Sequence, residues 1–363
     1  MSVLAAIAVL ALLIFVHELG HFAAARLQQI HANRFSIGFG PVLLKYQGSE
    51  TEYAIRAFPL GGYVGFPDDD PDSKIPSDDP DLLRNRPILD RAIVISAGVI
   101  ANLIFAYFLL VSQAAIVGIP DGFSYEPGIV VTQIIAQDSP AARAELQPGD
   151  TIVAIANRQL DASAEAATIF KEVVENAPGQ PLELEIVRAD QPLSLTLTPE
   201  EDARGKGRIG IGLAPNRTMT HRQPQNILAA FAVGAEQFQN ITILTVKGFG
   251  QLLSNFKATA EQVAGPVAIV DIGAKMARTD AGNLFQFGAL ISINLAIINI
   301  LPLPALDGGQ LAFLLIEGLR GKPLPSRIQD GIMQTGLVLL LGLGMFLIVR
   351  DTTNLTVFQQ LFQ

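Results

Sequence analysis

Residues 2–21 read SVLAAIAVLALLIFVHELGH, an apolar run that ends in two histidines and a glutamate. The run carries no charged side chain before Glu18, and as a helix it rises about 24 Å between Met1 and His17, most of the way across a hydrocarbon core about 30 Å thick. A glutamate at this depth costs a few kcal/mol unless other groups compensate for it. The stretch therefore predicts a transmembrane helix over 1–26 whose polar end has a chemical role.

A cleavable signal peptide is the alternative interpretation of this run, because Ala23-Ala24-Ala25 resembles a cleavage site. No lysine or arginine precedes the run, however, and cleavage would remove His17, Glu18 and His21. A retained helix is therefore favoured.

The rest of the chain also has the composition of a membrane protein. Half of the 363 residues are apolar and 16% are charged. Further transmembrane segments are expected over 92–119, 284–316 and 331–350, because each is long and nearly free of charge. The range 225–257 is apolar but carries several glutamines, so we expect an amphipathic helix on the membrane surface. The expected fold class is a polytopic α-helical membrane protein with about four transmembrane helices.

Basic residues predict how these segments are oriented in the bilayer. Lysines and arginines occur in the loop 27–91 and in 307–330, whereas 1–16 and 351–363 contain none. Basic loops stay in the cytoplasm, so both termini should lie outside. The net charge of −9 leaves no basic surplus to neutralise phosphates, and no nucleic-acid partner is expected.

The range 121–215 differs from its surroundings and predicts an inserted soluble, β-rich domain. Alternating apolar residues indicate strands, and one stretch has helical spacing. The run Asp138-Ser139-Pro140-Ala141-Ala142, followed by Leu146-Gln147-Pro148-Gly149-Asp150, resembles a PDZ domain; an unrelated small β-rich domain is the alternative. The resemblance is to circularly permuted bacterial PDZ domains. It implies that the peptide-binding edge comes near the end of the domain's sequence, at Ile209, Gly210 and Ile211.

His17 and His21 are four residues apart, so a helix places both on one face with Cβ atoms about 5–6 Å apart. Two such imidazoles can bind one Zn²⁺ ion, with Glu18 beside the bound water as general base. A catalytic zinc needs a third protein ligand. The chain has no cysteine, and Leu27 stands where a metzincin has its third histidine. His31 could contribute, but it lies in a polar loop where we expect it to be solvated.

Asp307 is the better candidate, in the segment NILPLPALDGG over 299–309. Its two prolines interrupt a helix, and irregular backbone inside a membrane is tolerated only where it is buried in protein or lines a water-filled cavity. Asp307 can meet His17 only if their two segments cross the membrane in the same direction. A crossing by 225–257 would reverse that direction, and this is why we expect 225–257 to lie on the surface.

HELGH, N-x-x-P-x-P-x-L-D-G and a PDZ domain between them resemble the site-2 protease family, in particular the bacterial regulator-of-sigma-factor type with a single PDZ domain. The resemblance covers nearly the whole chain. It implies an intramembrane zinc metalloprotease that cleaves single-span membrane proteins, such as anti-sigma factors, within or near their transmembrane segments in regulated proteolysis. The membrane implied is a bacterial inner membrane, or alternatively a plastid membrane.

The same resemblance assigns roles to individual residues. It implies His17, His21 and Asp307 as zinc ligands and Glu18 as the catalytic base. It also implies a membrane-dipping β-hairpin over 52–66 with its turn at Gly61-Gly62. Four residues are implied to bind substrate: Asn102, Asn299, Gly61 and Gly62.

Two functions from other classes compete with this interpretation. A membrane PDZ scaffold with a non-catalytic metal site is the first, and Glu18 argues against it because a structural site needs ligands but no base. A transporter would explain the intramembrane Asp307, but it predicts internal repeats that the sequence does not show.

Overall fold

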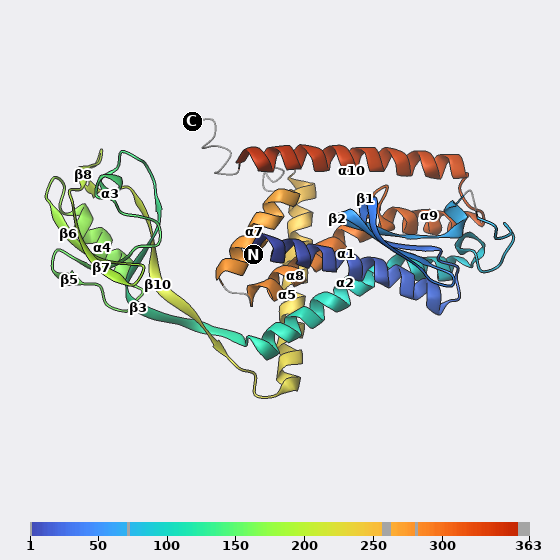
Figure 1. Ribbon diagram of the computed structural model, residues 1–363, viewed down its shortest axis with the longest axis horizontal. Helices are drawn as coiled ribbons and strands as arrows, with labels where there is room; N and C mark the ends of the chain where they lie inside the picture. The colour runs from blue at the N-terminus through green and yellow to red at the C-terminus, as the bar shows by residue number, and fades with distance from the viewer. Residues whose placement is uncertain (1, 71–72, 256–262, 280–281, 355–363) are drawn as a thin grey trace. The chain divides into compact units, whose positions relative to one another are not determined.

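The structure is a computed structural model that describes residues 2–70, 73–255, 263–279 and 282–354 (Figure 1). The chain divides into two compact units. The first unit joins Met1–Gly118 to Gln223–Gln363, and the second is Ile119–Arg222.

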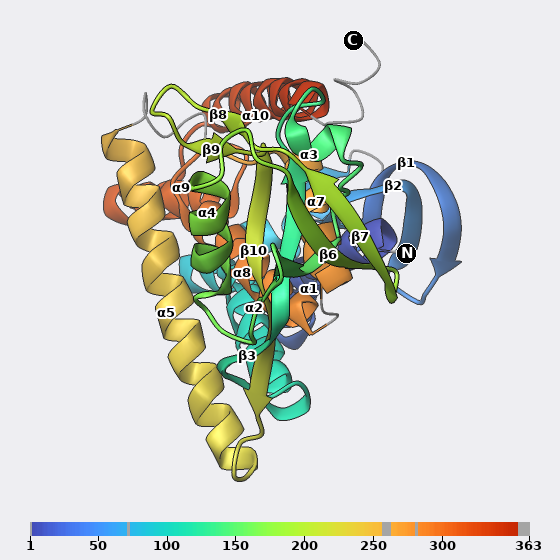
Figure 2. The ribbon, with the colours of Figure 1, turned by 90° about the vertical axis from the view of Figure 1, so that its left-hand side faces the viewer.

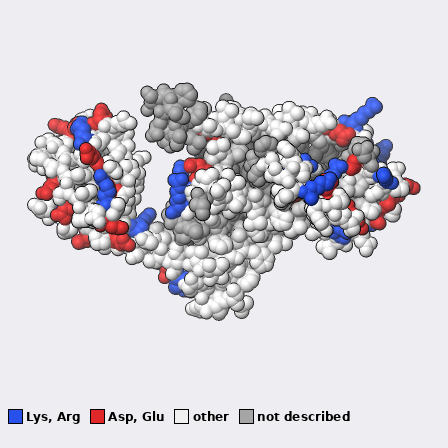
Figure 3. All heavy atoms as spheres, in the orientation of Figure 1, with Lys and Arg blue, Asp and Glu red and all other residues white. Residues whose placement is uncertain are grey.

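The first unit is built from helices. Its helices are α1 (Ser2–Leu27), α2 (Ile88–Ile116), α5 (Ile227–Ser254), α7 (Pro266–Thr279), α8 (Asn283–Ile300), α9 (Asp307–Arg320) and α10 (Ser326–Asn354). Among the described residues, five of these helices are long and apolar enough to cross a membrane: α1, α2, α5, α8 and α10. Charged side chains are sparse over the visible face of these helices and gather where the β1–β2 and α9 region lies (Figure 3). The expected class, a polytopic helical membrane protein, is confirmed.

The segment predicted as one span over 284–316 is two helices. α8 ends at Ile300 and α9 begins at Asp307, with both prolines in the break. A side chain at Gly308 would place its Cβ 2.1 Å from the carbonyl oxygen of Leu301, so glycine is required where α9 packs back against the end of α8. The prolines end the helical ladder, and the glycine allows the return.

Helix α5 runs crosswise to α1 and α10 in both views (Figures 1 and 2). It packs on α2, where a Cβ at Gly234 would lie 2.6 Å from Val111 and where Ala230 is buried against Ala114. Its length and composition would also allow a transmembrane helix.

A small sheet follows α1. It consists of β1 (Arg34–Gln47) and β2 (Glu52–Gly65). Residues 34–37 pair in parallel with 52–55 and antiparallel with 62–65, so the first part of β1 lies between the two ends of β2. The predicted hairpin turn at Gly61-Gly62 is therefore wrong, because the two ends of β2 are not neighbours. A local sequence pattern could not reveal the strand between them.

The second unit is the PDZ domain. Its elements are β3 (Ile119–Ile134), α3 (Pro140–Arg143), β4 (Thr151–Ile155), β5 (Arg158–Gln159), α4 (Ala166–Glu175), β6 (Leu182–Arg188), β7 (Gln191–Leu197), β8 (Glu200–Glu201), β9 (Gly207–Arg208) and β10 (Ile211–Arg222). The main sheet has the antiparallel order β10-β3-β4-β6-β7, with β5 paired to β4. Phe170 of α4 is buried in the core against this sheet. The last strand in the sequence is thus an edge strand beside the first.

Asp150, at the end of the L-x-P-G-D motif, holds the turn before β4. Its side chain is 1% exposed. The carboxylate accepts hydrogen bonds from the backbone N–H of Gln147 at 2.8 Å and from Arg188 Nε and Nη2 at 2.7 Å each. Burial opposes the ionised carboxylate, but the bonds from Arg188 and Gln147 outweigh it, and the pKa of Asp150 is lowered.

Asp150→Asn should lower the free energy of unfolding of the PDZ domain by about 2 kcal/mol at pH 7, the range for a hydrogen bond to a charged group. A carboxylate with a lowered folded pKa contributes stability above its unfolded pKa of about 3.9, and this contribution is lost as the pH falls through the folded value. Hydrogen exchange of the β4 and β6 amides in the full chain measures both effects. Glu185→Gln, at an exposed position of β6, is the control and should change neither. Equal protection of Asp150→Asn and wild type at pH 7 would contradict the prediction.

Candidate active site

The polar end of α1 meets the first residue of α9. His17 Nε2 lies 3.1 Å from His21 Nε2 and 3.2 Å from Asp307 Oδ2. His21 Nε2 lies 3.5 Å from the same oxygen. The structure therefore brings together the three residues that the sequence suggested as metal ligands.

The triangle formed by these three atoms has the size of one face of a zinc tetrahedron. Zinc bonds of about 2.0–2.1 Å place two ligand atoms about 3.3–3.4 Å apart. Asp307 Oδ2 is buried and has no hydrogen-bond donor, a costly state that a bound cation would relieve. Two imidazole nitrogens and a carboxylate oxygen are also ligands that zinc prefers, so the residues present fit the ion.

Two groups on α2 orient the histidines. His21 Nδ1 lies 2.8 Å from the carbonyl oxygen of Val94 and donates to it, so in the neutral ring Nε2 carries the lone pair. His17 Nδ1 lies 3.4 Å from the side-chain amide of Asn102, whose Oδ1 is buried without a partner. When the Asn102 amide is rotated by 180° so that its oxygen and nitrogen exchange places, Oδ1 accepts a hydrogen bond from the Nδ1–H of His17. Both rings then present Nε2 lone pairs to the same point.

Glu18 and the residues expected to bind substrate line one cavity of about 350 Å³. The cavity is lined by His17, Glu18, Gly61, Gly62, Asn102, Asn299 and Asp307, among others. Asn299 Nδ2 lies 3.3 Å from His17 Nε2, and a Cβ at Gly62 would lie 2.8 Å from Glu18 Cγ. The strand that carries Gly62 thus lies directly against the candidate base.

The segment that delivers Asp307 is held from α10. A Cβ at Gly336 would lie 2.2 Å from Pro304 Cβ, so α10 contacts this loop closely. The backbone N–H of Ala305, a residue with a φ of 66°, donates to the sulfur of Met333 at 3.3 Å. Asp307 then opens α9, where a negative charge is favoured by the helix dipole.

His31 lies outside this site. Its Nε2 is 3.7 Å from Asp79 Oδ1, in a half-buried cluster that also includes Asp81. Sequence reasoning did not identify Val94, because a backbone carbonyl leaves no signal in the residue type. It also gave no separate role to Gly98, where a Cβ would lie 2.3 Å from His21 Nε2.

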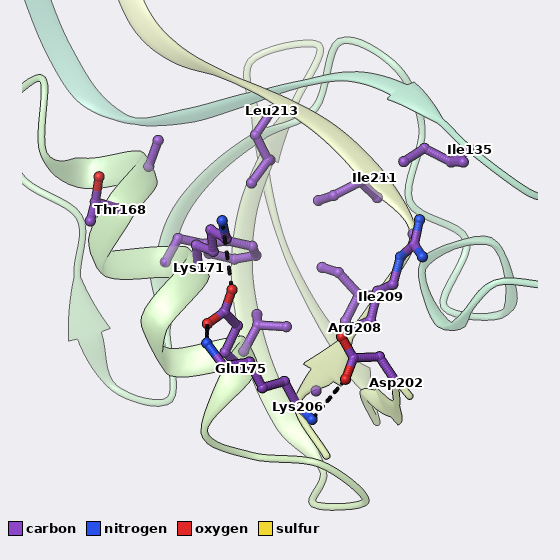
Figure 4. Close-up of a pocket in the computed structure, with 15 residues that line it drawn as sticks. Ile135, Thr168, Lys171, Glu175, Asp202, Lys206, Arg208, Ile209, Ile211 and Leu213 are labelled. Atoms are coloured by element: carbon purple, nitrogen blue, oxygen red, sulfur yellow. Dashed lines mark hydrogen bonds and ion pairs between the residues drawn. The ribbon is translucent and has the colours of Figure 1, made fainter. Parts of the chain in front are cut away.

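The PDZ domain has a groove of its own, about 520 Å³ in volume, between α4 and the start of β10. Ile209, Gly210 and Ile211 line it, as the sequence suggested. Figure 4 shows Ile209, Ile211 and Leu213 on one side and Thr168, Lys171 and Glu175 of α4 on the other. Gly210 has a φ of 77°, a conformation that favours glycine.

Comparison with known proteins gives one consistent family. The profile of peptidase family M50 matches residues 5–343. A protein of Nostoc sp. that carries the name of a zinc metalloprotease is 63% identical over 100% of both chains. The chloroplastic membrane metalloprotease ARASP of Arabidopsis thaliana is 47% identical over 98% of this chain and 79% of its own. The regulator of sigma-W protease RasP of Bacillus subtilis is 28% identical over 98% of this chain and 99% of its own.

Gly98→Ala should displace the His21 ring, because the new methyl group would occupy the position of the imidazole. A shift of about 1 Å in a reacting group reduces activity roughly 100-fold, and metal binding should weaken with it. Zinc content of the purified protein and a cleavage assay measure the two effects. Gly344→Ala is the matched control on α10, where a Cβ meets nothing within 4 Å. Wild-type zinc content and activity in Gly98→Ala would refute this arrangement of the site.

Proposed function

This chain belongs to peptidase family M50 and is an intramembrane zinc metalloprotease, and we propose that His17, His21 and Asp307 bind the zinc ion while Glu18 acts as the base. The observation that carries the proposal is the triangle of two imidazole nitrogens and one buried carboxylate oxygen that accepts no hydrogen bond. Its sides match the ligand spacing of a tetrahedral zinc site. One position of such a site stays open for water or substrate.

The proposed reaction is hydrolysis of a peptide bond. When bound, zinc polarises the scissile carbonyl and lowers the pKa of the attacking water. Glu18 accepts a proton from that water and delivers it to the leaving amine as the C–N bond breaks. Asn102 orients His17, and the amide of Asn299 lies where it can hydrogen-bond the substrate backbone.

The substrate is proposed to be a single-span membrane protein whose helix unwinds at the cleavage site. Proteolysis needs an extended peptide, and Gly61 and Gly62 lie in a strand beside Glu18. Pairing of the substrate with this strand would hold it extended across the cavity. The names of the relatives support a role in regulated proteolysis with substrates of the anti-sigma-factor type. The groove at Ile209–Ile211 is proposed to bind a peptide.

The location is proposed to be a bacterial inner membrane, and the 47% identity to a chloroplastic relative supports a plastid membrane as the alternative. In the proposed topology the loop 27–91 faces the cytoplasm and the PDZ domain faces outside. Exposed apolar side chains of the β1–β2 sheet, such as Phe39 and Leu44, support the proposal that this sheet dips into the membrane. Helix α5 is proposed to lie on the membrane surface, with its polar residues toward water.

Glu18→Gln should abolish cleavage and leave about one zinc ion per chain, because it removes the base and keeps all three ligands. Both cleavage and bound zinc should be lost in the three ligand variants His17→Ala, His21→Ala and Asp307→Ala. Elemental analysis gives the zinc content, and comparison of the membrane proteins that accumulate in cells expressing each variant gives the activity. Glu236→Gln, which alters an exposed glutamate of α5, should match wild type. Full activity in Glu18→Gln would overturn the proposed mechanism.

The surface position of α5 predicts that residues on either side of it are reached from the same face of the membrane. The chain has no native cysteine, so Arg217→Cys and Thr279→Cys can be labelled with a membrane-impermeant thiol reagent without background. Both should react from outside in intact cells. Labelling of the two positions from opposite faces would show that α5 spans the membrane. Lys74→Cys, in the loop proposed to be cytoplasmic, is the control and should react only after the cells are opened.

A further inference from the structure

An ion pair between Arg91 and Glu317 joins α9, which carries Asp307, to α2, which contacts the two histidines of α1. Arg91 Nη1 donates to Glu317 Oε2 at 3.0 Å, and Arg91 Nη2 donates to Glu317 Oε1. Two parallel bonds fix the mutual orientation of the two groups as well as their separation. Both side chains are only 15% exposed, so water and salt screen this pair less than a surface pair.

Arg91 lies on α2, the helix against which the two histidines of α1 pack. One turn after it, the carbonyl of Val94 accepts the hydrogen bond from His21. One turn further, Gly98 leaves the space that both imidazole rings occupy. Contacts from α2 therefore orient the rings of His17 and His21.

Glu317 lies on α9, whose first residue is Asp307. The first turn of this helix packs on the end of α8 and on the loop before it. Its buried residues are Gly308, Gly309 and Leu314, whereas Leu315 and Leu319 are 66% and 81% exposed. The segment 301–306 before it is non-helical and contains two prolines. The contact through Glu317 thus ties the C-terminal half of α9 to α2, the helix that orients the histidine rings.

We propose that Arg91 and Glu317 are positioning residues for the metal: their ion pair fixes α9 on α2 and so holds the Asp307 carboxylate within reach of His17 and His21. This inference rests on the proposed zinc site. Glu317 lies about 15 Å from Asp307 along α9, because the ten residues between them rise 1.5 Å each. Removal of one partner leaves the other charge buried without a counterion. The helix then shifts, and Asp307 moves relative to two histidines that stay in place.

The test is the zinc affinity of the purified full-length protein, measured by competition with a chelator. Glu317→Gln should bind zinc about tenfold more weakly than wild type, the low end of the range for loss of a group that directly supports a ligand. Arg91→Lys keeps the charge and loses the double hydrogen bond, so its zinc affinity should lie between those of wild type and Glu317→Gln. Arg91→Glu combined with Glu317→Arg restores the pair in reverse and should recover affinity relative to either single change. Arg84→Gln is the matched control, because Arg84 lines the same cavity but pairs with Asp68.

Each result decides the matter. Wild-type affinity in Glu317→Gln, or an equal loss in Arg84→Gln, overturns the positioning role while leaving the zinc site intact. Failure of the wild-type protein to bind zinc overturns the proposed function instead. If the exchanged pair does not fold, Arg91→Lys decides alone, and an affinity no higher than that of Glu317→Gln overturns the proposal.

Discussion

One carboxylate must reach two histidines inside a membrane, and the rest of the helical unit depends on that requirement. A charged side chain at this depth is expensive unless it has a partner, and Asp307 Oδ2 is buried with no hydrogen-bond donor. A helix running through this point could not supply both the turn and the cavity, so the chain breaks between α8 and α9. The prolines, the positive φ of Ala305 and the glycines after Asp307 all serve that break.

Close approach of backbones makes this arrangement possible without a large apolar core. A Cβ at Gly20 would lie 2.5 Å from the carbonyl oxygen of Ala97, so α1 and α2 touch at the turn between the two histidines. Gly98, on the facing surface, gives the imidazoles their space. Association of helices in lipid relies on such small residues, because lipid tails are as apolar as leucine and burial of apolar surface gains little.

Much of this site could be predicted from sequence because its chemistry is encoded in residue type and spacing. H-E-x-x-H needs only helical periodicity to place His17 and His21 together, and an aspartate beside prolines in an apolar run requires a compensating partner. The PDZ domain was also visible, because Asp150 and its turn form a local motif. The sheet of β1 and β2 was misread, since pairing of 34–37 with both ends of β2 is set by contacts distant in sequence. The Val94 carbonyl and the Arg91–Glu317 pair were missed for the same reason.

Helix α10 shows how a weakly packed element can still support the site. Most of its side chains are exposed in the helical unit, yet both of its ends are tied down. Near its start, Gly336 packs on Pro304 and Met333 accepts from Ala305. Near its end, the buried Asp351 accepts a hydrogen bond from the backbone N–H of Ala268 at 3.0 Å, in the first turn of α7. Since the free N–H groups at a helix start need acceptors, α10 satisfies α7 at one end while bracing the loop before Asp307 at the other.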